Sequence, residues 1–67
     1  MSYYKEGKIV EINGQYVTIQ VLDRQAISYE VTLPVETANL IDIAVRCIGE
    51  EVRFDTRDGK ISEINPV

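Results

Sequence analysis

Two nearly identical stretches, GKIVEIN at residues 7–13 and GKISEIN at residues 59–65, decide how this chain folds. They differ only at the fourth position, where Val10 is exchanged for Ser62. Each stretch opens with a glycine and continues with residues that favour sheets, so each predicts the start of a β-strand. The residues that follow do not repeat, and periodic repeat architectures need at least three units. We therefore interpret the pair as two strands of similar design in one sheet.

The first stretch ends in a predicted hairpin turn at Asn13 and Gly14. Asn-Gly is the strongest short-range hairpin signal, because both central residues of a type I′ turn need a positive φ. The resulting register points Val10 and Ile12 into the core and leaves Ile9 on the outer face. A bend in this strand that turns Ile9 into the core is the open alternative.

Two further runs, QYVTIQV at residues 15–21 and ISYEVTL at residues 27–33, alternate apolar and polar residues. Alternation with a period of two indicates strands with one buried and one exposed face. Residues 22–26 connect the runs, and matching their inner faces pairs Thr18 with Glu30. The expected inner residues are Val17, Ile19, Val21, Ile27, Tyr29, Val31 and Leu33. The expected outer residues are Tyr16, Thr18, Gln20, Ser28, Glu30 and Thr32.

From Thr37 the apolar residues adopt helical spacing, at positions 40, 41, 44, 45 and 48. Pro34 ends the preceding strand because it lacks an N–H for the ladder. The pattern predicts an amphipathic helix with Thr37 as the N-cap and Gly49 as the C′ residue. A strand over residues 41–48 is the alternative, since Ile, Val and Cys favour sheets.

A second hairpin is expected at residues 50–65. A two-residue turn at Asp58 and Gly59 would set Phe54 opposite a glutamate, so we predict a three-residue loop over residues 57–59 with a G1 bulge. This register places Phe54 opposite Ser62 and leaves Ile61 on the outer face.

The expected element order is three strands, one helix and two strands. It is typical of a mainly β protein with a five-stranded OB-like (Greek-key) barrel and one helix between strands 3 and 4. An SH3-like barrel is the alternative, and it would lack a full helix at residues 37–48. A chain of 67 residues has room for one small core, so residues 1–67 are expected to form a single domain.

Three motifs support this architecture: G-x-I-V-E in the first strand, Y-E-V-x-x-P-x-x-T at Tyr29–Thr37, and G-x-E-V-x-F at Gly49–Phe54. In these motifs the chain resembles the N-terminal barrel of the Holliday-junction-binding subunit of the bacterial branch-migration complex. The resemblance covers residues 7–54 and implies an OB-type barrel. That family makes its main DNA contacts through a helix-hairpin-helix domain, for which this chain has no room.

Composition narrows the function. The net charge is −4, which disfavours approach to phosphate backbones. The chain has no histidine, and this removes the usual general base and the commonest metal ligand, so we expect no enzyme activity, no cofactor and no metal. We interpret the single cysteine, Cys47, as a core residue. The lone thiol, the missing signal peptide and the lack of a membrane-spanning run predict a cytoplasmic protein without membrane contact.

OB-type barrels bind ligands on the outer surface of strands 2 and 3. Here that surface is almost uncharged, and the cores of protein interfaces favour tyrosine and apolar groups over charge. We therefore predict a protein-interaction module, either a homo-oligomer or an accessory subunit, that uses the outer face of strands 1–3. Its expected partner-binding residues are Ile9, Tyr16, Thr18, Gln20, Thr32 and Ile61. The alternative is a single-stranded nucleic-acid-binding OB-type module that uses Tyr16, Arg24, Arg53 and Arg57.

Overall fold

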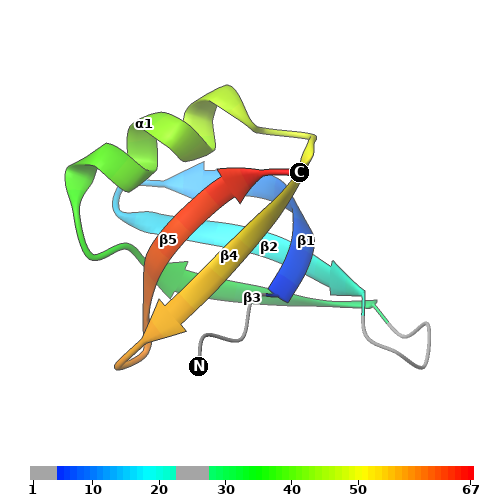
Figure 1. Ribbon diagram of the computed structural model, residues 1–67, viewed down its shortest axis with the longest axis horizontal. Coiled ribbons are helices and arrows are strands. Elements are labelled where there is room, and N and C mark those ends of the chain that lie inside the picture. The colour runs from blue at the N-terminus through cyan, green and yellow to red at the C-terminus, as the bar shows by residue number, and fades with distance from the viewer. Residues whose placement is uncertain (1–4, 23–27) are drawn as a thin grey trace.

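The structure is a computed structural model that describes residues 5–22 and 28–67. This part of the chain forms five antiparallel strands and one helix (Figure 1). Their order is β1 (Lys5–Asn13), β2 (Tyr16–Leu22), β3 (Ser28–Pro34), α1 (Ala38–Arg46), β4 (Glu51–Arg57) and β5 (Lys60–Pro66). The mainly β class and the helix between β3 and β4 are confirmed. The alternative of a strand over residues 41–48 is wrong.

The strands form one sheet in the order β3-β2-β1-β4-β5. β1 pairs with β2 along most of its length and with β4 through its first four residues, Lys5–Lys8. The sheet curls, so that β4 and β5 cross in front of β2 and β3 (Figure 1). The end strands meet at one parallel bridge between Val35 and Ile61, where the Glu36 N–H donates to the Ile61 carbonyl over 3.0 Å. Among the described residues, no continuous ladder closes the sheet into a barrel.

β1 carries a β-bulge at Val10. Ile9 pairs with Ile19 and Glu11 pairs with Thr18, so Val10 is the extra residue. A bulge shifts the alternation of side chains by one residue. Ile9 is therefore fully buried, while Val10 is 41% exposed. The prediction that Val10 points inward and Ile9 outward is wrong, and the alternative in which Ile9 turns into the core is right.

The turn between β1 and β2 lies one residue later than predicted. Gly14 and Gln15 form it, and Asn13 pairs with Tyr16 inside the ladder. Gly14 has a φ of +62° and Gln15 has no positive φ, which is the pattern of a type II′ turn and not of type I′. The later turn keeps Ile12 on the inner side, where it packs against the core.

β5 carries a second bulge at the equivalent residue, Ser62. The register between β4 and β5 skips Ser62, and the isoleucines on either side of it, Ile61 and Ile64, are 0% and 1% exposed. The predicted exposure of Ile61 is wrong for the same reason as that of Ile9.

The hairpin between β4 and β5 has a two-residue turn, so the predicted three-residue loop is wrong. Asp58 and Gly59 have φ values of 54° and 76°, which fit a type I′ turn. Phe54 then lies opposite Ile64, because the bulge corrects the register that the short turn alone would give. Both residues are buried in the core.

The inner residues of β2 are confirmed, since Val17, Ile19 and Val21 are at most 5% exposed. The pairing with β3 differs by two residues from the prediction: Thr18 lies opposite Thr32, and Glu30 lies opposite Gln20. The same residues still share the outer face, because a shift of two preserves the alternation. Ile27 and most of the predicted connection lie outside the described residues.

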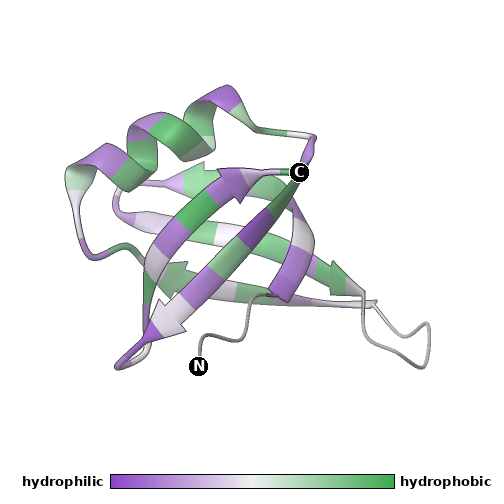
Figure 2. Cartoon of the chain, in the orientation of Figure 1, coloured by the Kyte–Doolittle hydropathy of each residue, from purple (hydrophilic) through white to green (hydrophobic). Residues whose placement is uncertain are grey.

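α1 packs against the curled sheet, and hydrophobic and hydrophilic residues alternate along the strands beneath it (Figure 2). Its buried residues are Leu40 and Ala44, followed by Cys47 at the C-cap. Cys47 is thus confirmed as a core residue. Val45 and Ile48 belong to the predicted apolar face but are 54% and 50% exposed. Ile43, which lies outside the predicted face, packs against the core instead, so the covered stripe of the helix is shifted from the one that the sequence pattern indicates.

Thr37 is the N-cap, as predicted, although its side chain makes no capping hydrogen bond. The C-terminal boundary differs, because the helix ends at Cys47 as the C-cap and Gly49 lies two residues beyond it. The chain turns there through a hydrogen bond from the Glu50 N–H to the Cys47 carbonyl, and the Gly49 N–H donates to the Ile9 carbonyl over 2.8 Å. This contact ties the end of the helix segment to β1.

Candidate interaction surface

The outward side chains of β2 and β3 form an exposed and almost uncharged surface, which we call the outer face. Alternation along the two strands, with the register between them, brings its residues together. The bulge adds Val10 beside it, on the part of β1 that lies next to Thr18. The members of the outer face are Val10, Tyr16, Thr18, Gln20, Ser28, Glu30 and Thr32, and the β1 residues opposite Gln20 and Thr18 border it with one charge each, Lys8 and Glu11.

A hydrogen bond fixes the centre of the outer face. The Thr18 and Thr32 hydroxyls lie 2.8 Å apart on directly opposed residues of β2 and β3. Threonine pairs across antiparallel strands stabilise the sheet and hold both side chains in one orientation. Tyr16 lies at one end of the face with 52% of its surface exposed. The ring is thus available to a partner next to a rigid centre.

Four of the six predicted partner-binding residues lie together on this face, namely Tyr16, Thr18, Gln20 and Thr32. Ile9 and Ile61 do not belong to it, because both are 0% exposed within the core cluster. Val10 is the surface residue that sequence reasoning missed. The signal for it is the spacing of the isoleucines at positions 9 and 12, which reach the same side of a strand only across a bulge.

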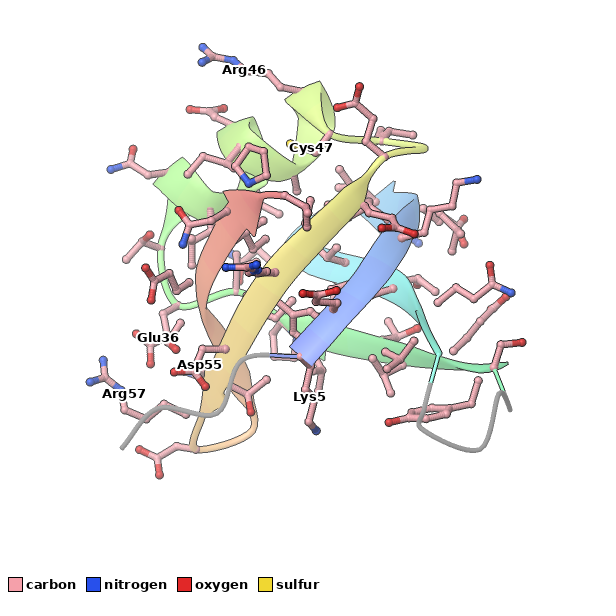
Figure 3. All side chains as sticks on the ribbon, turned by 45° about the vertical axis from the view of Figure 1, so that its right-hand side comes forward. Lys5, Glu36, Arg46, Cys47, Asp55 and Arg57 are labelled. Atoms are coloured by element: carbon pink, nitrogen blue, oxygen red, sulfur yellow. The ribbon has the colours of Figure 1, made fainter. Side chains whose placement is uncertain are left out.

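The arginines of the nucleic-acid alternative do not converge on Tyr16. Arg53 is on β4, which β1 separates from β2, and its Nε lies 3.3 Å from Glu6 Oε1. Arg57 binds Glu36 through two hydrogen bonds, with Nη2–Oε1 at 2.8 Å and Nε–Oε2 at 3.0 Å (Figure 3). Arg24 lies outside the described residues. The two arginines of this alternative that the structure describes, Arg53 and Arg57, are therefore engaged by carboxylates.

The ion pair between Glu36 and Arg57 shifts the pKa of both side chains. The hydrogen bond from Arg57 lowers the pKa of Glu36 below its ordinary value, with burial opposing this effect. The same bond raises the pKa of Arg57 above its already high value. A guanidinium held in this bidentate geometry is matched to one carboxylate, so a phosphate would have to displace Glu36.

One hollow of about 350 Å³ borders the outer face at Gln20 and Ser28 and continues to Glu6 and Glu51. Within residues 5–22 and 28–67, no group of three or more Cys, Asp or Glu side chains is placed to hold a metal ion. No helix in the same ranges is long and apolar enough to span a membrane.

The fold and the site define a small, mainly β domain in which β2 and β3 expose a sheet surface with one charged residue of their own, Glu30. Comparison of the chain with protein-family models, with curated proteins and with solved structures finds no match. The resemblance to the N-terminal barrel of the junction-binding subunit therefore stays a prediction from three short motifs.

Proposed function

We propose that this chain is a non-enzymatic protein-interaction module with an OB-like barrel, and that it contacts its partner through the outer face of β1–β3. The OB fold is a partly open five-stranded Greek-key barrel, and ligands bind to its strands 2 and 3. The strand order and the parallel bridge between Val35 and Ile61 support this architecture, since they bring β3 and β5 together where such a barrel closes.

One observation carries the functional proposal: the outer face is exposed and holds one charged residue on β2 and β3, Glu30, while Lys8 and Glu11 of β1 border it with opposite charges. Val10 and Tyr16 present apolar surface, and the Thr18–Thr32 pair supplies hydroxyls whose orientation is already fixed. Interface cores are enriched in tyrosine and depleted in charged residues. A protein surface with an apolar or aromatic centre and a few hydrogen-bonding groups is the partner that fits this chemistry.

The experiment compares two exposed valines. Tagged wild-type chain, Val10→Asp and Val45→Asp are used to recover partners from an extract of the source cells. Val10 is 41% exposed beside the outer face, and Val45 is 54% exposed on α1, so both substitutions add the same charge at similar exposure. We expect Val10→Asp to lose the partner that the wild type recovers and Val45→Asp to keep it.

Thermal melts of all three chains establish that each is folded at the temperature used. Tyr16→Ser is a second variant on the outer face, and it should reduce recovery as Val10→Asp does. Equal recovery by wild type and Val10→Asp would contradict the proposal. Loss with Val45→Asp alone would contradict it too, and would assign binding to the helix.

Single-stranded nucleic-acid binding is the competing hypothesis. It would need Arg53 and Arg57 to leave their carboxylate partners, and the outer face offers one aromatic ring, Tyr16, for base stacking. Fluorescence anisotropy with a mixed-sequence oligonucleotide at low salt separates the two. Non-specific binders reach Kd values of about 10⁻⁴–10⁻⁶ M, so we expect no binding at ~100 μM chain.

A further inference from the structure

β3 is an end strand of the sheet, and within residues 5–22 and 28–67 no strand pairs with the other side of its backbone. It pairs with β2 from Ser28 to Pro34. Its other contact is the bridge beyond its C-terminal end, between Val35 and Ile61. Unpaired strand edges are templates for pairing with another chain unless charge, proline, a bulge or a cover blocks them. Within β3 the blocking features are limited to Glu30 and to Pro34 at its end.

The backbone groups on the open side can be assigned by alternation. The Val35 N–H donates to the Gln15 carbonyl, in continuation of the β2–β3 ladder, and the Glu36 N–H points the other way, to Ile61. Successive residues of a strand direct their N–H and C=O to opposite sides. Ser28, Glu30 and Thr32 therefore direct theirs away from β2. In residues 5–22 and 28–67, these groups bond to no other backbone group.

The inner side chains of β3 are less covered than those of β2. Tyr29 is 43% exposed, and Val31 and Leu33 are partly exposed, whereas Val17 and Ile19 on the neighbouring strand are 0% exposed. The uncovered apolar row thus runs along the same strand as the open backbone groups. A strand added at this edge would satisfy both.

We propose that β3 of a second copy of this chain adds to this edge in antiparallel orientation, about a two-fold axis at Val31. Val31 then faces the partner's Val31, and Tyr29 faces the partner's Leu33, so the inner row continues across the dimer. Glu30 faces the partner's Thr32, and each pair exchanges two backbone hydrogen bonds. Ser28 donates to the carbonyl of the partner's Pro34, and because proline has no N–H, the Ser28 carbonyl receives no bond in return.

The charge of Glu30 and the positions of the backbone N–H donors favour a second copy of this chain at the β3 edge, and they favour this register. With the axis at Glu30, two carboxylates would lie directly opposite each other, which destabilises an antiparallel pair. With the axis at Thr32, Glu30 would meet the partner's Pro34, which has no donor, and Ser28 would meet the partner's Glu36, whose N–H already binds Ile61. Of these three registers, the axis at Val31 keeps Glu30 away from its copy and leaves only one outward backbone group of each chain without a partner, namely the Ser28 carbonyl.

The dimer uses the open backbone groups of β3 and the proposed function uses the outward side chains, so the dimer goes beyond the proposed function and either can fail without the other. The closed two-fold geometry uses each β3 edge once and leaves no β3 edge for a third copy.

The register makes a charge-specific prediction for sedimentation equilibrium. Thr32→Lys would face Glu30 of the partner subunit twice in the dimer, and opposite charges on directly opposed residues favour pairing. At about 0.2–1 kcal/mol for each of the two pairs, the dimer Kd should fall by about 2- to 30-fold. Thr32→Glu should raise the Kd by a similar factor.

Thr18→Lys is the matched control. It removes the same Thr18–Thr32 hydrogen bond and adds the same charge to the outer face, but it lies on β2, away from the edge. We expect its dimer Kd to equal that of wild type, because residue 18 faces no residue of the partner. A wild-type chain that remains monomeric to about 1 mM overturns the proposal. A dimer that Thr32→Lys and Thr32→Glu weaken alike, or leave unchanged, also overturns it.

Discussion

At the scale of single residues, Val10 and Ser62 explain why two stretches of this chain look alike. Each stretch contains isoleucines three positions apart, and in a regular strand such residues point to opposite faces. A bulge between them brings both to the core side. The bulged residue is the position at which the two stretches differ, because it faces outward and is free to vary between Val and Ser.

Adjacent residues of the second stretch should therefore differ sharply in their contribution to stability. Ile61 is 0% exposed, so Ile61→Ala should lower the free energy of unfolding by about 2–5 kcal/mol. Ser62→Ala, at the bulge, should change it by about 0.5 kcal/mol or less. Urea unfolding followed by circular dichroism measures both. Equal losses for the two variants would contradict the bulge at Ser62.

At the scale of elements, the sequence predicts which segments are strands and helix better than how they pair. β2 alternates without interruption from residue 16 to 21, and its inner residues are as expected. β1 and β5 each contain a bulge, and an argument from alternation alone inverts Ile9 and Ile61. Turn dipeptides are ambiguous in a similar way, since Asn13-Gly14 fits a type I′ turn but Asn13 joins the ladder.

The candidate site also divides into residues that period-two alternation predicts and residues that it does not. Tyr16, Thr18, Gln20 and Thr32 follow from period-two alternation, which survives a register shift of two. Val10 could not be predicted by that argument, because its exposure depends on the bulge. The arginines could be identified as basic residues, but their pairing with Glu6 and Glu36 depends on strand order, which local patterns do not contain.

The contact between the end strands makes a prediction for pH. Glu36 follows β3 and Arg57 ends β4, beside the bridge of Val35 to Ile61. The pKa of Glu36 is lowered in the folded chain, mainly by the hydrogen bond from Arg57. Its contribution to stability is therefore present above the unfolded-state pKa and is lost as the pH falls through the folded-state pKa.

The melting temperatures of wild type and Glu36→Gln should accordingly differ most near neutral pH and converge in acid. The double variant Glu36→Gln/Arg57→Gln is the control, because it lacks both partners and should show no further pH dependence from this pair. A difference that grows as the pH falls would have the wrong sign and would contradict the ion pair.

At the scale of the whole molecule, a small acidic chain exposes a surface on β2 and β3 that has one charged side chain, Glu30. The net charge is −4, and the two arginines nearest to a nucleic-acid role are held by Glu6 and Glu36. A core of this size rarely contributes more than about 3–5 kcal/mol of net stability, so association with a partner would add usefully to it. The fold and the charge distribution both favour contact with protein over contact with phosphate.

The most direct test of this account is the salt dependence of partner binding by the wild-type chain. The Kd for the partner recovered through the outer face is measured between about 50 and 200 mM salt. We expect a change of less than about threefold, because an apolar, uncharged contact releases few counterions. A loss of affinity of about 10³-fold over the same range, as 6–10 phosphate contacts would give, would contradict the account and favour nucleic-acid binding.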